Sequence, residues 1–274
     1  MTFTPSVWGT CKKAFHHLIR KILDHRYTRK FAGKYPQTYQ FLLDRFSLDA
    51  FTGLPLTFLF AAFIFNLLLL DEIVESFVNS SAIVGIDNAL AHILFQMRMN
   101  GVAQAFYYFS MFGSFWGVVS IAIISTIAFY KTKKKLYILP TWISLLCTQV
   151  TIVSGKNYFH RLRPEDISYY KESSYSFPSG HATVSVAFYG VLFYSIIRSR
   201  RRYSSKFRWT VAAVFFIGLL GFSRLYLGVH YLSDVLAGYS LGLLWLLMAI
   251  SISEWTVHKK KKKKMAVSVE VKTE

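Results

Sequence analysis

Long apolar runs constrain this chain more than any other feature of its sequence. Six such runs are separated by polar stretches: Leu54–Leu70, Phe106–Tyr130, Leu136–Val153, Ala182–Ile197, Trp209–Phe222 and Leu232–Ile252. A helix that crosses the hydrocarbon of a bilayer needs about 20 apolar residues. The chain is also 53% apolar and 18% aromatic, which excludes a disordered basic protein. We therefore predict an all-α, polytopic membrane protein with six transmembrane helices.

Two of the six runs are short and reach spanning length only by including polar residues at one end. The fourth run must include Ser179–His181, and the fifth must include Ser223–Leu227. Polar residues at membrane depth usually face the interior of a helix bundle and mark functional sites. These two ends are therefore candidate parts of a site.

The formal net charge of +18 is distributed unevenly along the chain. Of the 32 Lys and Arg, 26 fall in residues 1–53, in Lys131–Lys135, in Arg198–Arg208 and after Ile252. The segments between them hold only 6, and cytoplasmic loops are the ones that collect Lys and Arg. We predict that both termini are cytoplasmic and that residues 71–105, 154–181 and 223–231 lie outside. The charge then reports topology and gives no reason to expect a nucleic-acid partner.

Three domains follow from this division of the chain. Residues 1–53 form a cytoplasmic basic leader, in which apolar residues at helical spacing predict an interfacial amphipathic helix; a solvated leader is the alternative. Residues 54–252 form the membrane domain, with an additional helix at Ile86–Met99 on the outer surface. Residues 253–274 form a Lys-rich cytoplasmic tail, predicted to be disordered and attracted, like the leader, to the anionic inner leaflet.

Residues that can carry chemistry gather in three clusters, all in the outer segments. The clusters are Lys156 followed after six residues by Arg163-Pro164, then Pro178-Ser179-Gly180-His181, then Ser223-Arg224 followed by His230 and Asp234. The alternating topology brings all three to the same face of the membrane.

The first two clusters, together with Arg224 of the third, have the chemistry of an anion site. Lys156, Arg163 and Arg224 would repel one another at the ends of spans unless an anion with several oxygens lay between them. The spacing of Lys156 and Arg163 places them on one face if the segment is helical. Ser179 and Gly180 precede a span, where backbone N–H groups at a helix start form a phosphate cradle, and Ser179 either adds its hydroxyl or caps the helix.

The third cluster has the chemistry of an oriented nucleophile. His230 and Asp234 are spaced i, i+4, so in a helix the carboxylate can accept a hydrogen bond from one imidazole nitrogen and leave the other to attack. His181 is then placed to protonate a leaving alkoxide. Taken singly, the features have structural explanations: a paired histidine, arginines that reach head groups, and a simple helix cap.

Several neighbouring residues have weaker interpretations. The side chains between Lys156 and Arg163 could contact a lipid head group, but we favour solvated loop or interfacial residues. The tyrosines before the second cluster could equally contact a head group or form an aromatic belt. Asn66, inside the first run, is predicted to form a hydrogen bond with another helix. The side chains between Lys156 and Arg163 are those of Tyr158, His160 and Arg161, and the tyrosines before the second cluster are Tyr169, Tyr170 and Tyr175. No metal-ligand pattern is evident, so we expect neither a metal nor a cofactor.

Together the clusters resemble the three-part signature of the type 2 phosphatidic acid phosphatase (PAP2) superfamily, which also contains vanadium haloperoxidases. Every motif position is present, over residues 156–234, and the six-run pattern extends the resemblance to about 54–252. The resemblance implies a PAP2-like bundle and metal-independent dephosphorylation through a phosphohistidine. It makes His230 the nucleophile, Asp234 its partner and His181 the general acid. The residues that it implies for holding phosphate are Lys156, Arg163, Ser179, Gly180 and Arg224.

The expected function is hydrolysis of a lipid phosphate monoester or pyrophosphate at the extracytoplasmic face of a bacterial cytoplasmic membrane. Phosphatidic acid, phosphatidylglycerophosphate, undecaprenyl pyrophosphate and lipid A phosphates all present the required phosphoryl group, and the motifs do not choose among them. Two alternatives stay open at this point. One is a vanadate-dependent haloperoxidase, and the other is a non-catalytic lipid binder or transporter with a relic site.

Overall fold

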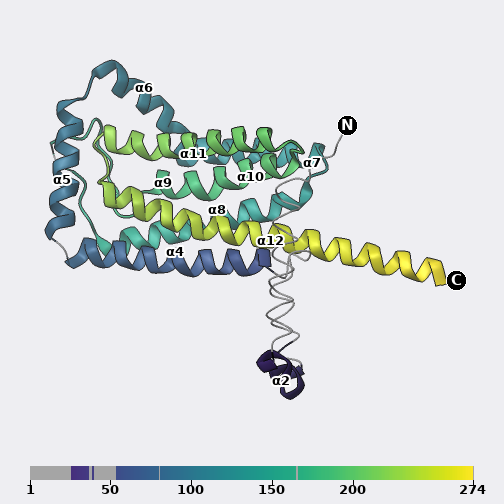
Figure 1. The fold of residues 1–274 in the computed structure, drawn as a ribbon. Coiled ribbons are helices and arrows are strands. Elements are labelled where there is room, and N and C mark those ends of the chain that lie inside the picture. Colours follow the sequence, from purple (N-terminus) through teal and green to yellow (C-terminus); the bar gives the residue numbers. More distant parts are fainter. Residues whose placement is uncertain (1–25, 37–38, 40–53, 80, 165, 274) are drawn as a thin grey trace, which may run out of the picture. The chain divides into compact units, whose positions relative to one another are not determined.

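A computed structural model describes residues 26–36, 39, 54–79, 81–164 and 166–273, and every regular element in these ranges is a helix (Figure 1). The chain divides into two compact units, one of residues 62–260 and the other of residues 1–61 and 261–274. The smaller unit contains α2 (Arg26–Lys34). The amphipathic leader helix predicted around residues 7–23 lies outside the described residues.

The larger unit carries the apolar helices, several of which are interrupted by short 3₁₀ or π segments. Their bounds are α4 (Leu54–Asn79), α5 (Ser81–Gln96), α6 (Asn100–Ser110), α7 (Phe115–Lys131), α8 (Ile138–Phe159), α9 (Gly180–Val184), α10 (Gly190–Ser199), α11 (Tyr203–Tyr226) and α12 (Leu232–Thr273). A π-helical turn, Ser185–Tyr189, joins α9 to α10, so that these elements form one span. The start of α4 and the end of α12 belong to the smaller unit.

The predicted multi-pass membrane architecture is confirmed, with one change. Among the described residues, five helices are individually long and apolar enough to cross a membrane. The second apolar run is instead a pair of helices, Asn100–Gly113 and Phe115–Lys131, which is bent by 53° and is a sixth candidate span when the two are taken together. A single helix over Phe106–Tyr130 was therefore the wrong prediction. The chain breaks at Ser114 because its hydroxyl accepts a hydrogen bond from the Gly117 N–H at 3.2 Å and caps α7.

Two further boundaries differ from the prediction. The outer helix predicted at Ile86–Met99 is present as α5 and begins five residues earlier, at Ser81. The Lys259–Lys264 run, predicted to be disordered, is part of α12, which continues to Thr273. Lysine is a good helix former, so a run of lysines extends a helix that already exists.

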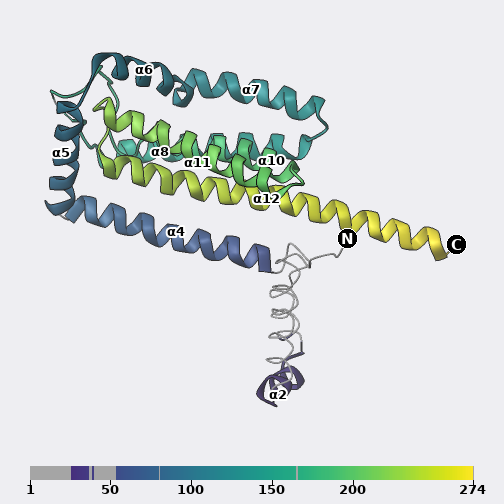
Figure 2. The ribbon, with the colours of Figure 1, turned by 45° about the horizontal axis from the view of Figure 1, so that its top comes forward.

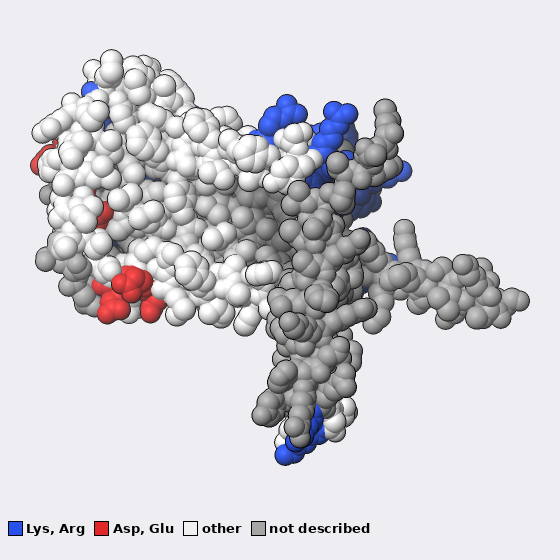
Figure 3. Space-filling model, viewed as in Figure 1, with Lys and Arg blue, Asp and Glu red and all other residues white. Residues whose placement is uncertain are grey.

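Within the larger unit, α8, α10, α11 and α12 run side by side, and α5 crosses one end of them (Figures 1 and 2). At that end α8 and α11 finish and α9 and α12 begin. The opposite end carries the Lys and Arg of residues 131–135 and 198–208, whereas acidic residues at the end of α4 lie on the α5 side (Figure 3). The three sequence clusters are therefore gathered at the end that is poor in basic residues.

Two glycines of α12 let it approach α9 closely. A Cβ atom at Gly238 would lie 2.7 Å from the carbonyl oxygen of Ser179, and one at Gly242 would lie 2.4 Å from that of Thr183. The Ser179 N–H also donates to the carbonyl oxygen of Asp234 at 3.0 Å. This backbone contact places the second sequence cluster directly against the third.

The predicted interhelical contact of Asn66 is confirmed. Asn66 Nδ2 donates to the carbonyl oxygen of Ser240 at 2.7 Å, and Ser240 Oγ donates to Asn66 Oδ1 at 2.8 Å. Asn66 is buried although Phe65 and Leu68, on the same helix, are 66% and 64% exposed. Reciprocal hydrogen bonds of this kind hold α4 against α12 where apolar packing is sparse.

Candidate active site

His230 lies in the short connection between α11 and α12 and is 2% exposed. Its Nδ1 faces Asp234 Oδ2 at 3.4 Å and Ser176 Oγ at 3.3 Å, and its Nε2 lies 3.2 Å from a guanidinium nitrogen of Arg163. Because α12 begins at Leu232, the predicted helical i, i+4 geometry of His230 and Asp234 is wrong. The pair still forms, since His230 sits just before the first turn of the helix that contains Asp234.

The hydrogen bonds around the His230 ring determine which nitrogen carries the proton. Arg163 can only donate, so Nε2 accepts and Nδ1 is the protonated nitrogen. Burial lowers the pKa of His230 well below its usual value, and the positive charges of Arg163 and Arg224 lower it further. The ring is therefore neutral, with an unprotonated Nε2 on the side of the cations.

Asp234 is fully buried and accepts several hydrogen bonds. Its Oδ2 accepts from Ser176 Oγ and from the Tyr231 N–H at 2.8 Å, and its Oδ1 accepts from Arg161 Nη1 at 2.6 Å. Ser176 also lies within 3.3 Å of His230 Nδ1, so it bridges the two partners. Nothing in the sequence singled out Ser176.

The three cations meet, although not in the predicted way. The helix α8 ends at Phe159, and His160 has a left-handed φ of 48°, so Lys156 and Arg163 do not share a helix face. A loop residue brings them together instead: Ser174 Oγ accepts from Lys156 Nζ at 2.9 Å and from Arg163 Nη2 at 3.1 Å. The predicted convergence is correct, and the predicted helical register is not.

Glu172 joins Arg163 to the third cation, Arg224. Its Oε2 lies 2.5 Å from Arg163 Nη2 and its Oε1 lies 2.5 Å from Arg224 Nη2, while the Tyr170 hydroxyl donates to Oε1 at 3.0 Å. Burial alone would raise the pKa of Glu172, but Arg224 and Arg163 outweigh it and lower the pKa to about 2. The carboxylate is therefore ionised and lies between the guanidinium groups that the motif assigns to phosphate.

Ser179 is the residue before α9, yet it does not cap the helix with its side chain. Its Oγ and the Nε of Arg224 are both buried and have no hydrogen-bond partner among the described residues. A buried donor without a partner costs about 1–3 kcal/mol. An anion bound between α9 and α11 would satisfy both donors, so the phosphate-contact interpretation of the Ser179 hydroxyl fits better than the capping one.

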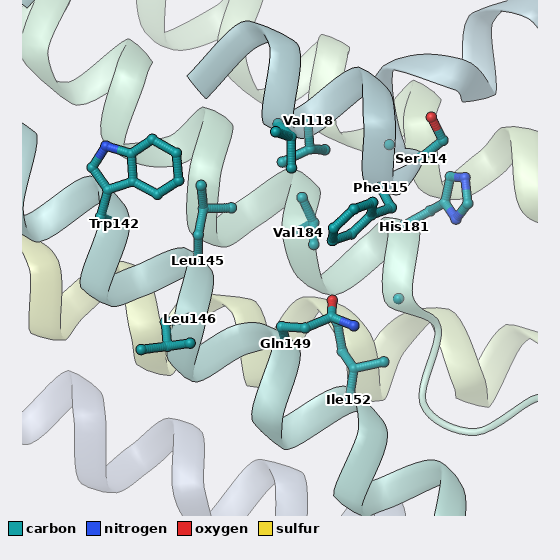
Figure 4. A pocket seen from close by; sticks show the side chains of 13 residues that line it. Ser114, Phe115, Val118, Trp142, Leu145, Leu146, Gln149, Ile152, His181 and Val184 are labelled. Atoms are coloured by element: carbon teal, nitrogen blue, oxygen red, sulfur yellow. The ribbon is translucent and has the colours of Figure 1, made fainter. Parts of the chain in front are cut away.

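His181, in the first turn of α9, borders two cavities. The first has a volume of about 380 Å³ and an almost wholly apolar lining from α7, α8 and α9, with His181 at one end and Trp142 at the other (Figure 4). The second, of about 530 Å³, is lined by Tyr107, Tyr170 and Glu172 among others. His181 thus stands where an apolar cavity meets the charged cluster.

The structure decides the interpretation of two neighbouring residues. Arg161, read as a solvated or interfacial residue, is 9% exposed and forms ion pairs with Asp87 at 2.7 Å and with Asp234 at 2.6 Å. Asp87 lies on α5, 74 positions earlier in the chain. Tyr170 contacts Arg224 and Glu172 and is not part of a simple aromatic belt.

All eight motif residues thus lie around one charged cluster at the α5 end of the bundle. Four further residues, none of which the sequence analysis assigned to the site, belong to the same cluster: Asp87, Arg161, Glu172 and Ser176. Over the described residues, no group of three or more His, Cys, Asp or Glu side chains is arranged to hold a metal ion.

Comparison with known proteins finds a family that shares these motifs. A family model described as the PAP2 superfamily matches residues 134–257, which include every motif position. Over these residues the chain is similar to the PAP2 superfamily. A crystal structure of a transmembrane PAP2-type phosphatidylglycerolphosphate phosphatase from Bacillus subtilis superimposes with a TM-score of 0.62 and 26% identity, covering 70% of this chain and 93% of that one.

Two curated relatives are similar over shorter stretches. Phosphatidylglycerophosphatase B of Bacillus subtilis is 42% identical over 91 residues, which are 32% of this chain and 44% of that protein. Lipid A 4'-phosphatase of Porphyromonas gingivalis is 31% identical over 166 residues, 54% of this chain and 66% of that protein. The chain therefore matches less than two thirds of the length of each curated relative.

Proposed function

We propose that this protein is a membrane lipid phosphatase that hydrolyses a phosphate monoester or pyrophosphate through a phosphohistidine at the extracytoplasmic face. One observation carries the proposal: His230 Nε2 lies 3.2 Å from Arg163 Nη1, which can only donate, beside the cluster that contains Lys156 and Arg224. A neutral nucleophile next to converging cations is suited to attack a group of concentrated negative charge. The curated relatives and the similar crystal structure, named for lipid phosphatases, support the same class.

In the first step, His230 Nε2 attacks phosphorus in line with the lipid oxygen. A bond forms between nitrogen and phosphorus, the bond between phosphorus and the lipid oxygen breaks, and His181 gives the leaving oxygen a proton. Asp234 and Ser176 hold the Nδ1 proton of His230, which becomes more acidic as Nε2 bonds to phosphorus. The Arg163, Arg224 and Lys156 cations stabilise the charge on the transferring phosphoryl oxygens.

In the second step, water attacks the phosphohistidine. The deprotonated His181 accepts a proton from the water as the oxygen–phosphorus bond forms and the nitrogen–phosphorus bond breaks. Inorganic phosphate leaves, and His230 and His181 return to their starting protonation states. No step requires a metal or a redox partner.

The apolar cavity supports a lipid substrate. Apolar side chains of α7, α8 and α9 line it from Trp142 to Ile152, and it reaches Gly180 and His181 (Figure 4). A hydrocarbon chain in this cavity would place its ester oxygen near His181, the proposed proton donor. Burial of each CH₂ group in such a cavity contributes about 0.8 kcal/mol, so long-chain substrates gain affinity that a small phosphate ester does not.

The test is phosphate release by purified wild-type protein and by His230→Ala. The panel contains phosphatidic acid, phosphatidylglycerophosphate, undecaprenyl pyrophosphate and a lipid A phosphate, because the motifs leave these open and the relatives are named for two of them. We expect release from at least one lipid and a loss of at least about a thousandfold in His230→Ala. Equal activity of the variant would disprove the mechanism, and halide oxidation with vanadate and peroxide would indicate a haloperoxidase.

A further inference from the structure

A buried ion-pair network contacts Asp234 through the carboxylate oxygen that does not face His230. Arg161 Nη1 donates to Asp234 Oδ1 at 2.6 Å, and Arg161 Nη2 donates to Asp87 Oδ2 at 2.7 Å. Asp87, Arg161 and Asp234 are 2%, 9% and 0% exposed. From this geometry we propose that Arg161, anchored by Asp87 of α5, is a positioning residue that orients Asp234 and, through it, His230.

Several protein groups hold the Arg161 guanidinium in one orientation. Besides the two carboxylates, Nη1 donates to Ser233 Oγ at 2.7 Å, and the guanidinium carbon lies 4.3 Å from the centre of the Tyr231 ring. A planar guanidinium that is hydrogen-bonded at both terminal nitrogens holds a carboxylate more rigidly than a single flexible contact does. Both terminal nitrogens of Arg161 donate to buried carboxylates, Nη1 to Asp234 and Nη2 to Asp87.

Asp87 in turn fixes the start of α12. Its Oδ1 accepts the Ser233 N–H at 3.0 Å, and its Oδ2 accepts the Ser233 hydroxyl. A carboxylate that accepts an N–H in the first turn of a helix stabilises that helix end. One side chain of α5 therefore anchors both Arg161 and the turn that carries Asp234.

The positive charge of Arg161 compensates two buried carboxylates. Asp87 and Asp234 are buried carboxylates that share Arg161 as a counter-charge, and removal of one partner of a buried pair leaves an uncompensated charge. With Oδ1 of Asp234 held by Arg161, Oδ2 is directed to Ser176 and His230. Oδ2 lies 3.4 Å from His230 Nδ1, which is already a long hydrogen bond. A small displacement of Asp234 would therefore break its contact with His230.

The inference rests on the proposed function and is tested by separating kcat from KM. We expect Arg161→Met to lower kcat by about tenfold or more, the usual range for residues that orient a catalytic group, while KM changes by less than about threefold for the lipid of the panel that the wild type hydrolyses. Arg161→Lys should recover part of the loss, because one ammonium can reach one carboxylate. The matched control is Arg198→Met, which removes an arginine–carboxylate pair (Arg198 Nε to Glu254 Oε1, 2.7 Å) at the opposite end of the bundle and should keep kcat.

A second variant covers the case in which Arg161→Met does not fold. Asp87→Asn keeps the contact between Arg161 and Asp234 but removes the anchor, and we expect a loss in kcat of about threefold or more. The double variant should be no worse than Arg161→Met, because both changes act on one network. Unchanged kcat in the folded variants, or an effect on KM alone, overturns the positioning role while wild-type activity stands. A wild type that releases no phosphate overturns the proposed function and this inference with it.

Discussion

Glu172 forms ion pairs with the two guanidinium groups that would bind a substrate phosphate. Its carboxylate contacts Arg163 and Arg224 at 2.5 Å each, and it is ionised at any pH above about 2. A phosphate must therefore displace this carboxylate or share the arginines with it. We expect Glu172→Gln to strengthen inhibition by inorganic phosphate or orthovanadate by about tenfold, since 1.4 kcal/mol of relieved competition is enough for that factor.

The measurement is the inhibition constant of each anion at fixed pH with a short-chain substrate. Glu75→Gln, which removes an exposed carboxylate from the end of α4, controls for the change in net charge. Weaker anion binding in Glu172→Gln would show that the carboxylate organises the arginines and does not compete with phosphate.

The pH dependence follows from the environment of His230. Burial lowers its pKa, and Arg163 and Arg224 add to the effect, so the ring stays neutral until the pH falls well below about 6.5, the ordinary value for histidine. Protonation of His230 removes the nucleophile, so the loss of kcat/KM on the acidic side of the profile should be centred well below pH 6.5. A profile of kcat/KM from pH 4 to 8 with a soluble substrate measures this, and an acidic loss centred at or above pH 6.5 would contradict it.

At the scale of helices, the contact between α12 and α9 determines whether the site assembles. A Cβ atom on Gly238 would lie 2.7 Å from the Ser179 carbonyl oxygen, so α12 and α9 must move apart to accommodate it. We expect Gly238→Ala to lower kcat by about tenfold or more, because Ser179 is hydrogen-bonded to the backbone of Asp234 and moves with α9.

Gly218→Ala is the matched control, because a Cβ atom there meets nothing within 4 Å. It should keep full activity and gain up to about 1 kcal/mol in stability from better helix propensity. Phosphate release and thermal unfolding of the two variants are compared side by side. Equal activity of both would mean that the two helices tolerate separation.

The cavity between α7 and α8 offers a test of chain recognition. Gln149 lines it from α8, whereas Val150, next in sequence and 58% exposed, does not. Gln149→Trp should raise KM for long-chain lipid phosphates by about tenfold while leaving KM for a water-soluble phosphate ester nearly unchanged, because only the chain uses the cavity. Val150→Trp should leave both constants unchanged, and an equal effect of both variants on both substrates would count against the cavity as a chain site.

What the sequence predicts well and poorly has a physical basis. Hydropathy predicts the spans because about 20 apolar residues are enough to define one. The motif spacing predicts the charged cluster because the topology brings the ends of the spans together. The break at Ser114 depends on one capping hydrogen bond, which a hydropathy average does not register. Arg161 was misread because its partner Asp87 lies 74 residues away, and Glu172 because its role appears only when Arg163 and Arg224 are in place.

For the whole molecule, the uneven distribution of charge argues for one orientation in the membrane. Lys and Arg of residues 131–135 and 198–208 gather at the end of the bundle opposite to the active-site cluster (Figure 3). Segments that retain many Lys and Arg stay in the cytoplasm. The site would then face outward, and a lipid in the outer leaflet could present its phosphate to it without crossing the bilayer.

Accessibility of single cysteines checks this orientation. In a background with Cys11 and Cys147 replaced by Ser, Lys171→Cys probes the exposed loop between α8 and α9, and Arg202→Cys probes the exposed turn between α10 and α11. We expect a membrane-impermeant maleimide to label Lys171→Cys in intact cells and to label Arg202→Cys only after the cells are opened. The reverse pattern would place the site in the cytoplasm, and the substrate would then have to be a lipid of the inner leaflet.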